Sequence, residues 1–136
     1  MIEQAILTML RSDTALMALL GNDPARVDLV DVAQGTTPPY LTFTLASGAR
    51  MGRGNLCDPT ALGLLSQQLM VTPWAPTAPA VHAINVAARA ALLCGMQTVG
   101  TVRIDSITWQ SYHTWAREPE TNLLTRGQTF AVQHTE

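Results

Sequence analysis

The fold is decided by the stretch Leu69-Met70-Val71-Thr72-Pro73-Trp74-Ala75-Pro76-Thr77. Within this stretch a predicted strand ends and a predicted helix begins. From Leu64 to Thr72, apolar and polar residues alternate, and a period of two predicts a strand with one buried face. Gln67 interrupts the apolar side of that strand. Pro73 has no N–H for a sheet ladder, so the strand is expected to end there or to lie at a sheet edge.

A helix is predicted directly after this strand. Thr77 is placed to cap it, and Pro79 is tolerated in its first turn. The helix should run to about Leu93, with Gly95 as its stop. Its apolar stripe consists of Val81, Ile84, Ala88, Ala91 and Leu92, and the residues expected to face away are His82, Asn85 and Arg89. Trp74, Pro76 and Thr77 are therefore assigned structural roles, with the indole of Trp74 available to cover the strand–helix junction.

The N-terminal part of the chain predicts one broken helix and two strands. Apolar spacing favours a helix over residues 2–10, and Ser12 or Asp13 can cap a second piece that stops at Gly21. Residues 26–32 are rich in valine and predict a strand, and residues 40–45 alternate as in a half-buried strand. A long connection over residues 46–60 is expected to follow.

The C-terminal part predicts two antiparallel strands joined by a long hairpin loop. The first covers residues 101–112, with a slipped alternation near Ser106 that indicates a β-bulge. The second covers residues 123–134, and the loop covers residues 113–122. Asn122 is suited to a left-handed conformation at the end of that loop. The element order α-β-β-β-α-β-β predicts a single α+β domain over residues 1–136. It should contain a mainly antiparallel sheet with two principal helices packed against it.

The composition indicates a protein that covers part of its surface with a partner. Of 136 residues, 47% are hydrophobic and only 13% are charged, about half the usual charged share of ~25%. The net charge of −2 gives no bulk attraction to nucleic acid. All eight basic residues are arginine, which suits interfaces, although a GC-rich genome would give the same bias. No signal-peptide pattern or apolar run of ~20 residues is present, so we expect a protein made in the cytoplasm without a membrane span.

The sequence predicts no catalytic, cofactor or metal site. Neither Cys57 nor Cys94 has a metal or redox spacing. Gly52-Arg53-Gly54 is not followed by the Lys-Ser/Thr of a phosphate-binding loop. Glu118 and Glu120 flank a proline in an expected exposed turn, where carboxylates stay solvated and cannot act as a general acid.

Two loops instead carry candidate interface residues. The first contains Arg50 and Arg53, which can dock on an acidic partner. The second contains Trp115 and Arg117, and both residue types are enriched at interface hot spots. The complete set of candidate interface residues is Arg50, Arg53, His113, Trp115, Arg117, Glu118 and Glu120.

In order and spacing, four stretches resemble the phage tail-completion proteins, also called tail terminators or head–tail joining proteins. They are the N-terminal helix with residues 12–16 and Gly21, residues 38–43, residues 69–76 leading into 87–92, and residues 102–104 followed by 118–124. The likeness covers nearly the full chain. Asn122 stands where the family often has glycine, and Pro73 stands where cysteine or aspartate often precedes the tryptophan.

The resemblance implies a structural protein of the virion and not an enzyme. Such proteins are subunits of a ring, expected to be hexameric, that caps the head-proximal end of the tail tube. The ring ends tube polymerisation and joins the tail to the head connector. The implied partners are further copies of the chain, the tail-tube protein and the connector, while DNA passes through the lumen without specific binding. Assembly would take place in the host cytoplasm. Another connector or tube subunit is the alternative, and a small enzyme or ligand-binding domain is a more distant one.

Overall fold

The central element of the fold is the long strand β4, Leu64–Ala75. The computed structural model describes residues 2–30, 38–46, 49–51, 64–93 and 96–135, without the side chains of residues 49–51, 64 and 65. β4 pairs with β2 (Tyr40–Leu45) on one side and with β9 (Gln128–Thr135) on the other. The sheet order is β1-β2-β4-β9-β6-β5, where β1 is Val27–Leu29, β5 is Gln97–Val99 and β6 is Val102–Tyr112.

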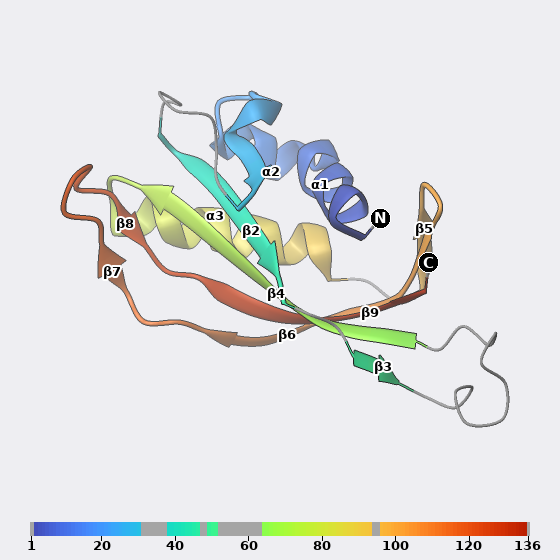
Figure 1. Ribbon diagram of the computed structural model, residues 1–136. Helices are drawn as coiled ribbons and strands as arrows, with labels where there is room; N and C mark the ends of the chain where they lie inside the picture. Colours follow the sequence, from blue (N-terminus) through green and yellow to red (C-terminus); the bar gives the residue numbers. More distant parts are fainter. Residues whose placement is uncertain (1, 31–37, 47–48, 52–63, 94–95, 136) are drawn as a thin grey trace, which may run out of the picture.

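The described strands form one curled sheet with a helical layer on one face (Figure 1). The pairing of β1 with β2 is parallel and the other pairings are antiparallel, which confirms the predicted α+β class with a mainly antiparallel sheet. The helices are α1 (Ile2–Ser12), α2 (Thr14–Leu19) and α3 (Ala78–Leu92). Asp13 caps α2 by accepting a hydrogen bond from the Leu16 amide, so the predicted break in the N-terminal helix is confirmed.

The core lies between the helices and the sheet face that they cover. Alternate residues of β4 and β9 are fully buried there, among them Leu69, Val71 and Phe130. α3 contributes Val81, Ile84, Ala88 and Leu92, as its apolar stripe predicts. Gln67 lies on the same side of the strand, where its Oε1 is 2.6 Å from His134 Nε2 and its Nε2 donates to the Ala46 carbonyl. These contacts explain how an apolar strand face accommodates an amide.

The expectation that β4 ends or lies at an edge at Pro73 was wrong. Pro73 is buried inside a central strand and pairs in register with Leu41. Because Gln68 accepts from the Ala46 amide on the β2 side, alternation turns the Pro73 nitrogen toward the opposite side. On that side, the ladder of β4 changes partner between Val71, which pairs with β9, and Trp74, which pairs with β8. The missing N–H therefore falls where no described strand residue is registered opposite it.

Three further boundaries differ from the sequence prediction. β1 is shorter than the predicted strand over residues 26–32, because Arg26 belongs to a 3₁₀ turn (Pro24–Arg26) and Val30 has φ of 67°. β3 (Ala49–Met51) lies within the predicted connection over residues 46–60 and pairs with β4. β5 was not predicted; it joins β6 through Gly100, whose φ of 62° suits a residue without a Cβ. Gly95, Cys57 and Cys94 lie outside the described residues.

The predicted C-terminal hairpin is confirmed, with additional structure inside it. β6 and β9 pair antiparallel, with register shifts between Ile104 and Ser106 and between Trp109 and Ser111; the first of these is the predicted bulge. The long loop contains β7 (Ala116–Arg117), which pairs with β8 (Leu124–Thr125). The single predicted strand over residues 123–134 is thus divided into β8 and β9. Asn122 has φ of 58°, as its left-handed tolerance predicts.

Candidate assembly surface

A continuous row of arginine and aromatic side chains runs beside α3 and β6 toward the β7–β8 hairpin. Its members, here called the cation–aromatic ladder, are Arg89, Trp109, Tyr112, Arg126 and Trp115. Arg89 Cζ lies 4.4 Å from the centroid of Trp109, and the rings of Trp109 and Tyr112 meet edge-on at 5.1 Å. Arg126 Cζ lies 4.5 Å from the Tyr112 centroid and 5.5 Å from that of Trp115. These distances are those of favourable cation–π and aromatic contacts.

Arg126 connects the hairpin to the body of the domain. Its Nε donates a hydrogen bond of 2.9 Å to the His113 carbonyl, while its guanidinium contacts the rings of Tyr112 and Trp115. Nη1 and Nη2 have no hydrogen-bond or ion-pair partner among the described residues, and neither is among their buried unpaired atoms. The residue therefore holds the hairpin with one edge of its guanidinium and keeps the other edge available to solvent.

A buried amide pair supports the ladder from the side of α3. Asn85 is 1% exposed, and its Nδ2 donates a 2.9 Å hydrogen bond to the Arg126 carbonyl. Gln128 is fully buried, and its Nε2 donates to the backbone carbonyl of Asn85. The expectation that Asn85 faces away from the core was wrong. Its side chain instead donates a hydrogen bond to the backbone carbonyl of Arg126, in the segment between β8 and β9.

Within the predicted hairpin site, the side chain of Arg117 is already engaged within the chain. Its Nη1 donates to both the carbonyl oxygen and the side-chain Oδ1 of Asn122, at 2.8 and 3.0 Å. Glu118 accepts a hydrogen bond from Thr121, whereas Glu120 is exposed and makes no described contact. Trp115 is 40% exposed. Trp115, Arg117 and Glu120 are thus the exposed residues among these four, and of the three Glu120 alone makes no described contact.

His113 lies at the base of the hairpin, with its Nε2 in hydrogen-bond contact with Thr129 Oγ1 on β9. Its backbone amide donates to the Gly127 carbonyl. Both contacts fix the point where the loop leaves β6, so His113 orders the base of the hairpin on which the candidate interface stands.

β3 and the β7–β8 hairpin lie at opposite ends of the molecule (Figure 1). β3, which contains Arg50, pairs with the start of β4 at residues 64–66, and β8 pairs with its end at Trp74 and Ala75. Eight residue steps at ~3.3 Å each separate these registers by roughly 26 Å. Arg50 and the ladder cannot therefore belong to one compact site. Arg53 lies outside the described residues, as does the side chain of Arg50.

Trp74 lies on the sheet face opposite the helices. The expectation that its indole covers the strand–helix junction was therefore wrong. It follows buried Pro73 and precedes buried Ala75, and its indole stacks on Tyr40 with centroids 6.3 Å apart. The indole Nε1 donates to Thr42 Oγ1 at 3.4 Å. Pro76 is exposed, and Thr77 caps α3 by accepting from the Ala80 amide, as predicted. The junction is held by the cap and by Ala75, and not by the indole.

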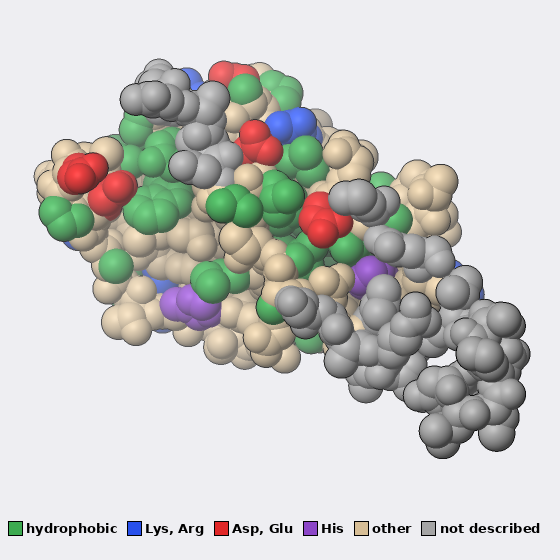
Figure 2. Space-filling view, viewed as in Figure 1, with side chains coloured by type: hydrophobic (Ala, Val, Ile, Leu, Met, Phe, Trp, Pro, Cys, Tyr) green, Lys and Arg blue, Asp and Glu red, His purple; other side chains and the backbone are tan. Residues whose placement is uncertain are grey.

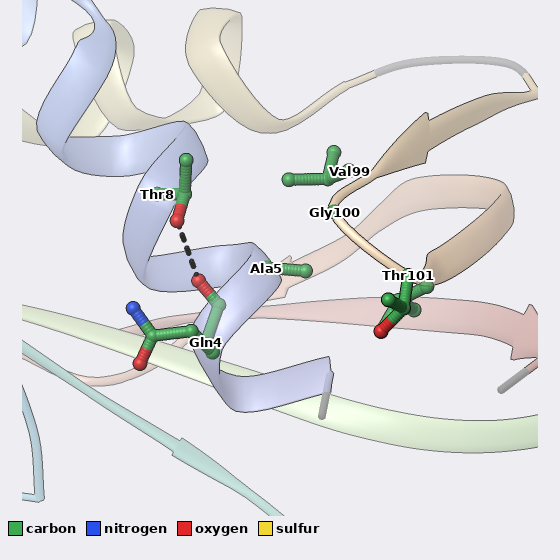
Figure 3. A pocket seen from close by; sticks show the side chains of 7 residues that line it. Gln4, Ala5, Thr8, Val99, Gly100 and Thr101 are labelled. Atoms are coloured by element: carbon green, nitrogen blue, oxygen red, sulfur yellow. Dashed lines mark hydrogen bonds between the residues drawn. The ribbon is translucent and has the colours of Figure 1, made fainter.

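A hollow of about 320 Å³ lies between α1 and the β5–β6 turn (Figure 3). Its lining residues are Gln4, Ala5, Thr8, Val99, Gly100, Thr101 and Val102. None of these side chains is titratable, and Thr8 uses its hydroxyl within the helix by donating to the Gln4 carbonyl. The hollow thus offers no general acid, base or nucleophilic pair, and it does not support the enzyme alternative.

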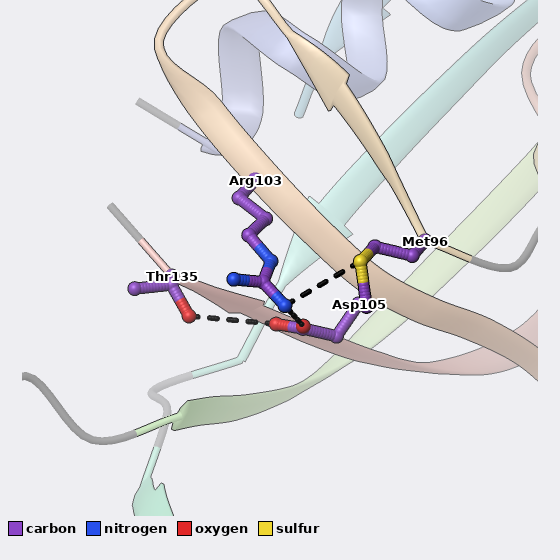
Figure 4. A network of polar contacts seen from close by, with 4 residues as sticks. All are labelled: Met96, Arg103, Asp105 and Thr135. Atoms are coloured by element: carbon purple, nitrogen blue, oxygen red, sulfur yellow. Dashed lines mark hydrogen bonds and ion pairs between the residues drawn. The ribbon is translucent and has the colours of Figure 1, made fainter.

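At the far end of β6, a polar network joins Met96, Arg103, Asp105 and Thr135 (Figure 4). Arg103 Nη2 lies 3.3 Å from Asp105 Oδ1, so this arginine has its own carboxylate. Across the described ranges, no three His, Cys, Asp or Glu side chains form a group that could hold a metal. None of the helices in the described part of the chain has the length and apolar character needed to cross a bilayer.

The fold is found among virion components. One solved structure with this architecture, titled "Virion of native gene transfer agent (GTA) particle", aligns with a TM-score of 0.72 and 14% sequence identity, covering 99% of this chain and 95% of that chain. No curated protein matches the chain. The sequence is more specific: the model of the family described as "Tail completion protein gp17" matches residues 4–133. The chain belongs to this family, and it is accordingly a structural component of a phage-type tail.

Proposed function

We propose that this chain is the subunit of a ring, formed by six copies, that caps the head-proximal end of a tail tube. The ring ends tube polymerisation and joins the tail to the head connector. The observation that carries this proposal is the match of the tail-completion family model over residues 4–133. On this proposal the chain is not an enzyme, and it is assembled in the host cytoplasm and located in the virion.

The surface chemistry supports a role in assembly. A ring requires two different patches on each subunit that fit each other and close. The ladder, with an exposed tryptophan and an arginine edge free to bind, has the residue types that dominate interface energetics. The formal net charge of −2 per copy is consistent with a lumen through which DNA passes without being held.

Electron microscopy of particles assembled without this protein tests the proposal. A tail terminator predicts tails of abnormal length, or finished heads and tails that remain unjoined. The alternative of a tail-tube subunit predicts heads with no tails, and a connector subunit predicts heads that fail to retain DNA while tails of normal length form. Normal, joined particles would refute all three roles.

A further inference from the structure

The ladder contains two arginines with no carboxylate partner among the described residues. The described ion pairs join Arg26 to Asp23 and Arg103 to Asp105. Neither Arg89 nor Arg126 lies within 4 Å of an acidic oxygen of a described residue. Both guanidinium groups contact aromatic rings instead, and both residues are half-buried. An aromatic side chain that covers the face of a guanidinium removes water there. The edge of the guanidinium remains suited to the planar, two-oxygen geometry of a carboxylate.

Exposed apolar side chains border the ladder on α3. Val86 is 50% exposed and Leu93 is 41% exposed, and they lie three residues before and four residues after Arg89. Residues at these spacings share one helix face. Together with Trp115, they give the ladder an apolar margin that association would remove from water. Apolar side chains around an arginine anchor form the arrangement in which interfacial ion pairs become strong, because solvent is excluded.

The same chain presents a carboxylate that has no partner in the part of the chain that the structure describes. Glu120 is exposed at the tip of the β7–β8 hairpin and makes no described hydrogen bond or ion pair. Acidic side chains gather at that end of the molecule (Figure 2). Pro119 restricts the backbone beside Glu120, which lowers the entropy lost when the tip is held. The tip and the ladder therefore carry opposite charges, and no ion pair of the described residues joins them within one chain.

We propose that the ladder of each copy receives the hairpin tip of a neighbouring copy, with the Glu120 carboxylate bound by the free edge of Arg126. Tip and ladder are different patches, so the contact can repeat head-to-tail from copy to copy, as a closed ring requires. Arg89, Val86 and Leu93 extend the receiving surface along α3. This inference rests on the proposed ring, and it specifies which residues form the subunit contact.

Charge reversal and its compensation test the contact. We expect Arg126→Glu and Glu120→Arg each to raise the dissociation constant of self-association at least tenfold, measured by analytical ultracentrifugation with and without tail-tube protein. An equimolar mixture of the two variants should return to within about threefold of wild type, since each variant supplies the charge that the other lacks. Arg103→Glu changes the net charge as Arg126→Glu does, but alters an arginine already paired with Asp105, so it serves as the matched control.

Each outcome decides the question. Glu120 makes no described contact, so Glu120→Arg should fold normally, and unchanged assembly of this variant would overturn the inference even if Arg126→Glu misfolds. Arg126→Gln, which keeps a donor near the His113 carbonyl, then replaces Arg126→Glu. A wild-type chain that stays monomeric even with tube protein would refute the ring and the contact together. Assembly of wild type, with equal effects from Arg126→Glu and Arg103→Glu, would refute the contact alone.

Discussion

Asn85 offers a test in which the sequence pattern and the structure predict effects of opposite sign. The helical pattern places Asn85 on the outer face of α3, whereas the structure buries it, with its Nδ2 2.9 Å from the Arg126 carbonyl. The perturbation is Asn85→Ala. It removes the hydrogen-bond donor and leaves the helix backbone, including the carbonyl that accepts from Gln128, unchanged.

The magnitude follows from three contributions. Leaving the Arg126 carbonyl without its donor costs about 1–3 kcal/mol, and the lower part of this range applies because the bond is only partly buried. The unpaired Oδ1 of Asn85 disappears with the side chain, which offsets part of the loss. Alanine also favours the helix by roughly 0.6 kcal/mol over asparagine. We therefore expect a net destabilisation of about 0.5 kcal/mol, or a fall in the melting temperature of about 2 °C for a domain of this size.

Thermal and guanidinium unfolding, followed by tryptophan fluorescence, measure this difference. His82→Ala is the matched control, because His82 is an exposed position of the same helix and makes no described contact. The control should be neutral or stabilising by roughly 0.5 kcal/mol, since alanine has the higher helix propensity. If Asn85→Ala stabilises the protein as much as His82→Ala does, Asn85 is a surface residue and the buried link from α3 to the β8–β9 turn does not exist.

Substitutions at four other residues test the strand–helix unit and the hairpin. Trp74→Ala should lower the free energy of unfolding by about 1–2 kcal/mol, below the ~3–5 kcal/mol of a fully buried tryptophan, because the indole is half-buried on the outer sheet face; a larger loss in urea titrations would contradict this placement. Thr77→Ala should cost about 1 kcal/mol and Thr77→Ser much less, since only alanine removes the cap of α3; equal melting temperatures for the two variants would argue against the cap. Trp115→Ala and Arg117→Ala should change the free energy of unfolding by no more than about 0.5 kcal/mol while weakening assembly in light-scattering measurements; a variant that unfolds would identify a core residue instead.

Several elements could be predicted from the sequence because their signals are local. The Asp13 cap, the Thr77 cap and the left-handed Asn122 each depend on one residue and its immediate backbone. The strand Tyr40–Leu45 follows directly from its alternation. The β-bulge near Ser106 was also visible as a slip in that period.

Features that depend on pairing partners could not be predicted. Pro73 continues a central strand because the pairing partner of β4 changes from β9 to β8 at that point. This change of partner strand is not a property of the β4 sequence itself. β3 and β5 contain only three residues each, too few for a period to be recognised, and pairing with β4 and β6 defines them. The position of Asn85 depends on a carbonyl 41 residues away.

The candidate site divides in the same way. The sequence by itself determined that Trp115 and its charged neighbours stand on a hairpin, because turn formers and two strand patterns bracket them. Only the tertiary structure decided that Arg126 holds that hairpin, that Arg117 is engaged by Asn122, and that Arg89 and Trp109 extend the row. The physical reason is that a cation–aromatic contact joins residues from different elements, whose separation in the chain carries no periodic signal, whereas caps, turns and amphipathic strands depend on neighbours within a few residues.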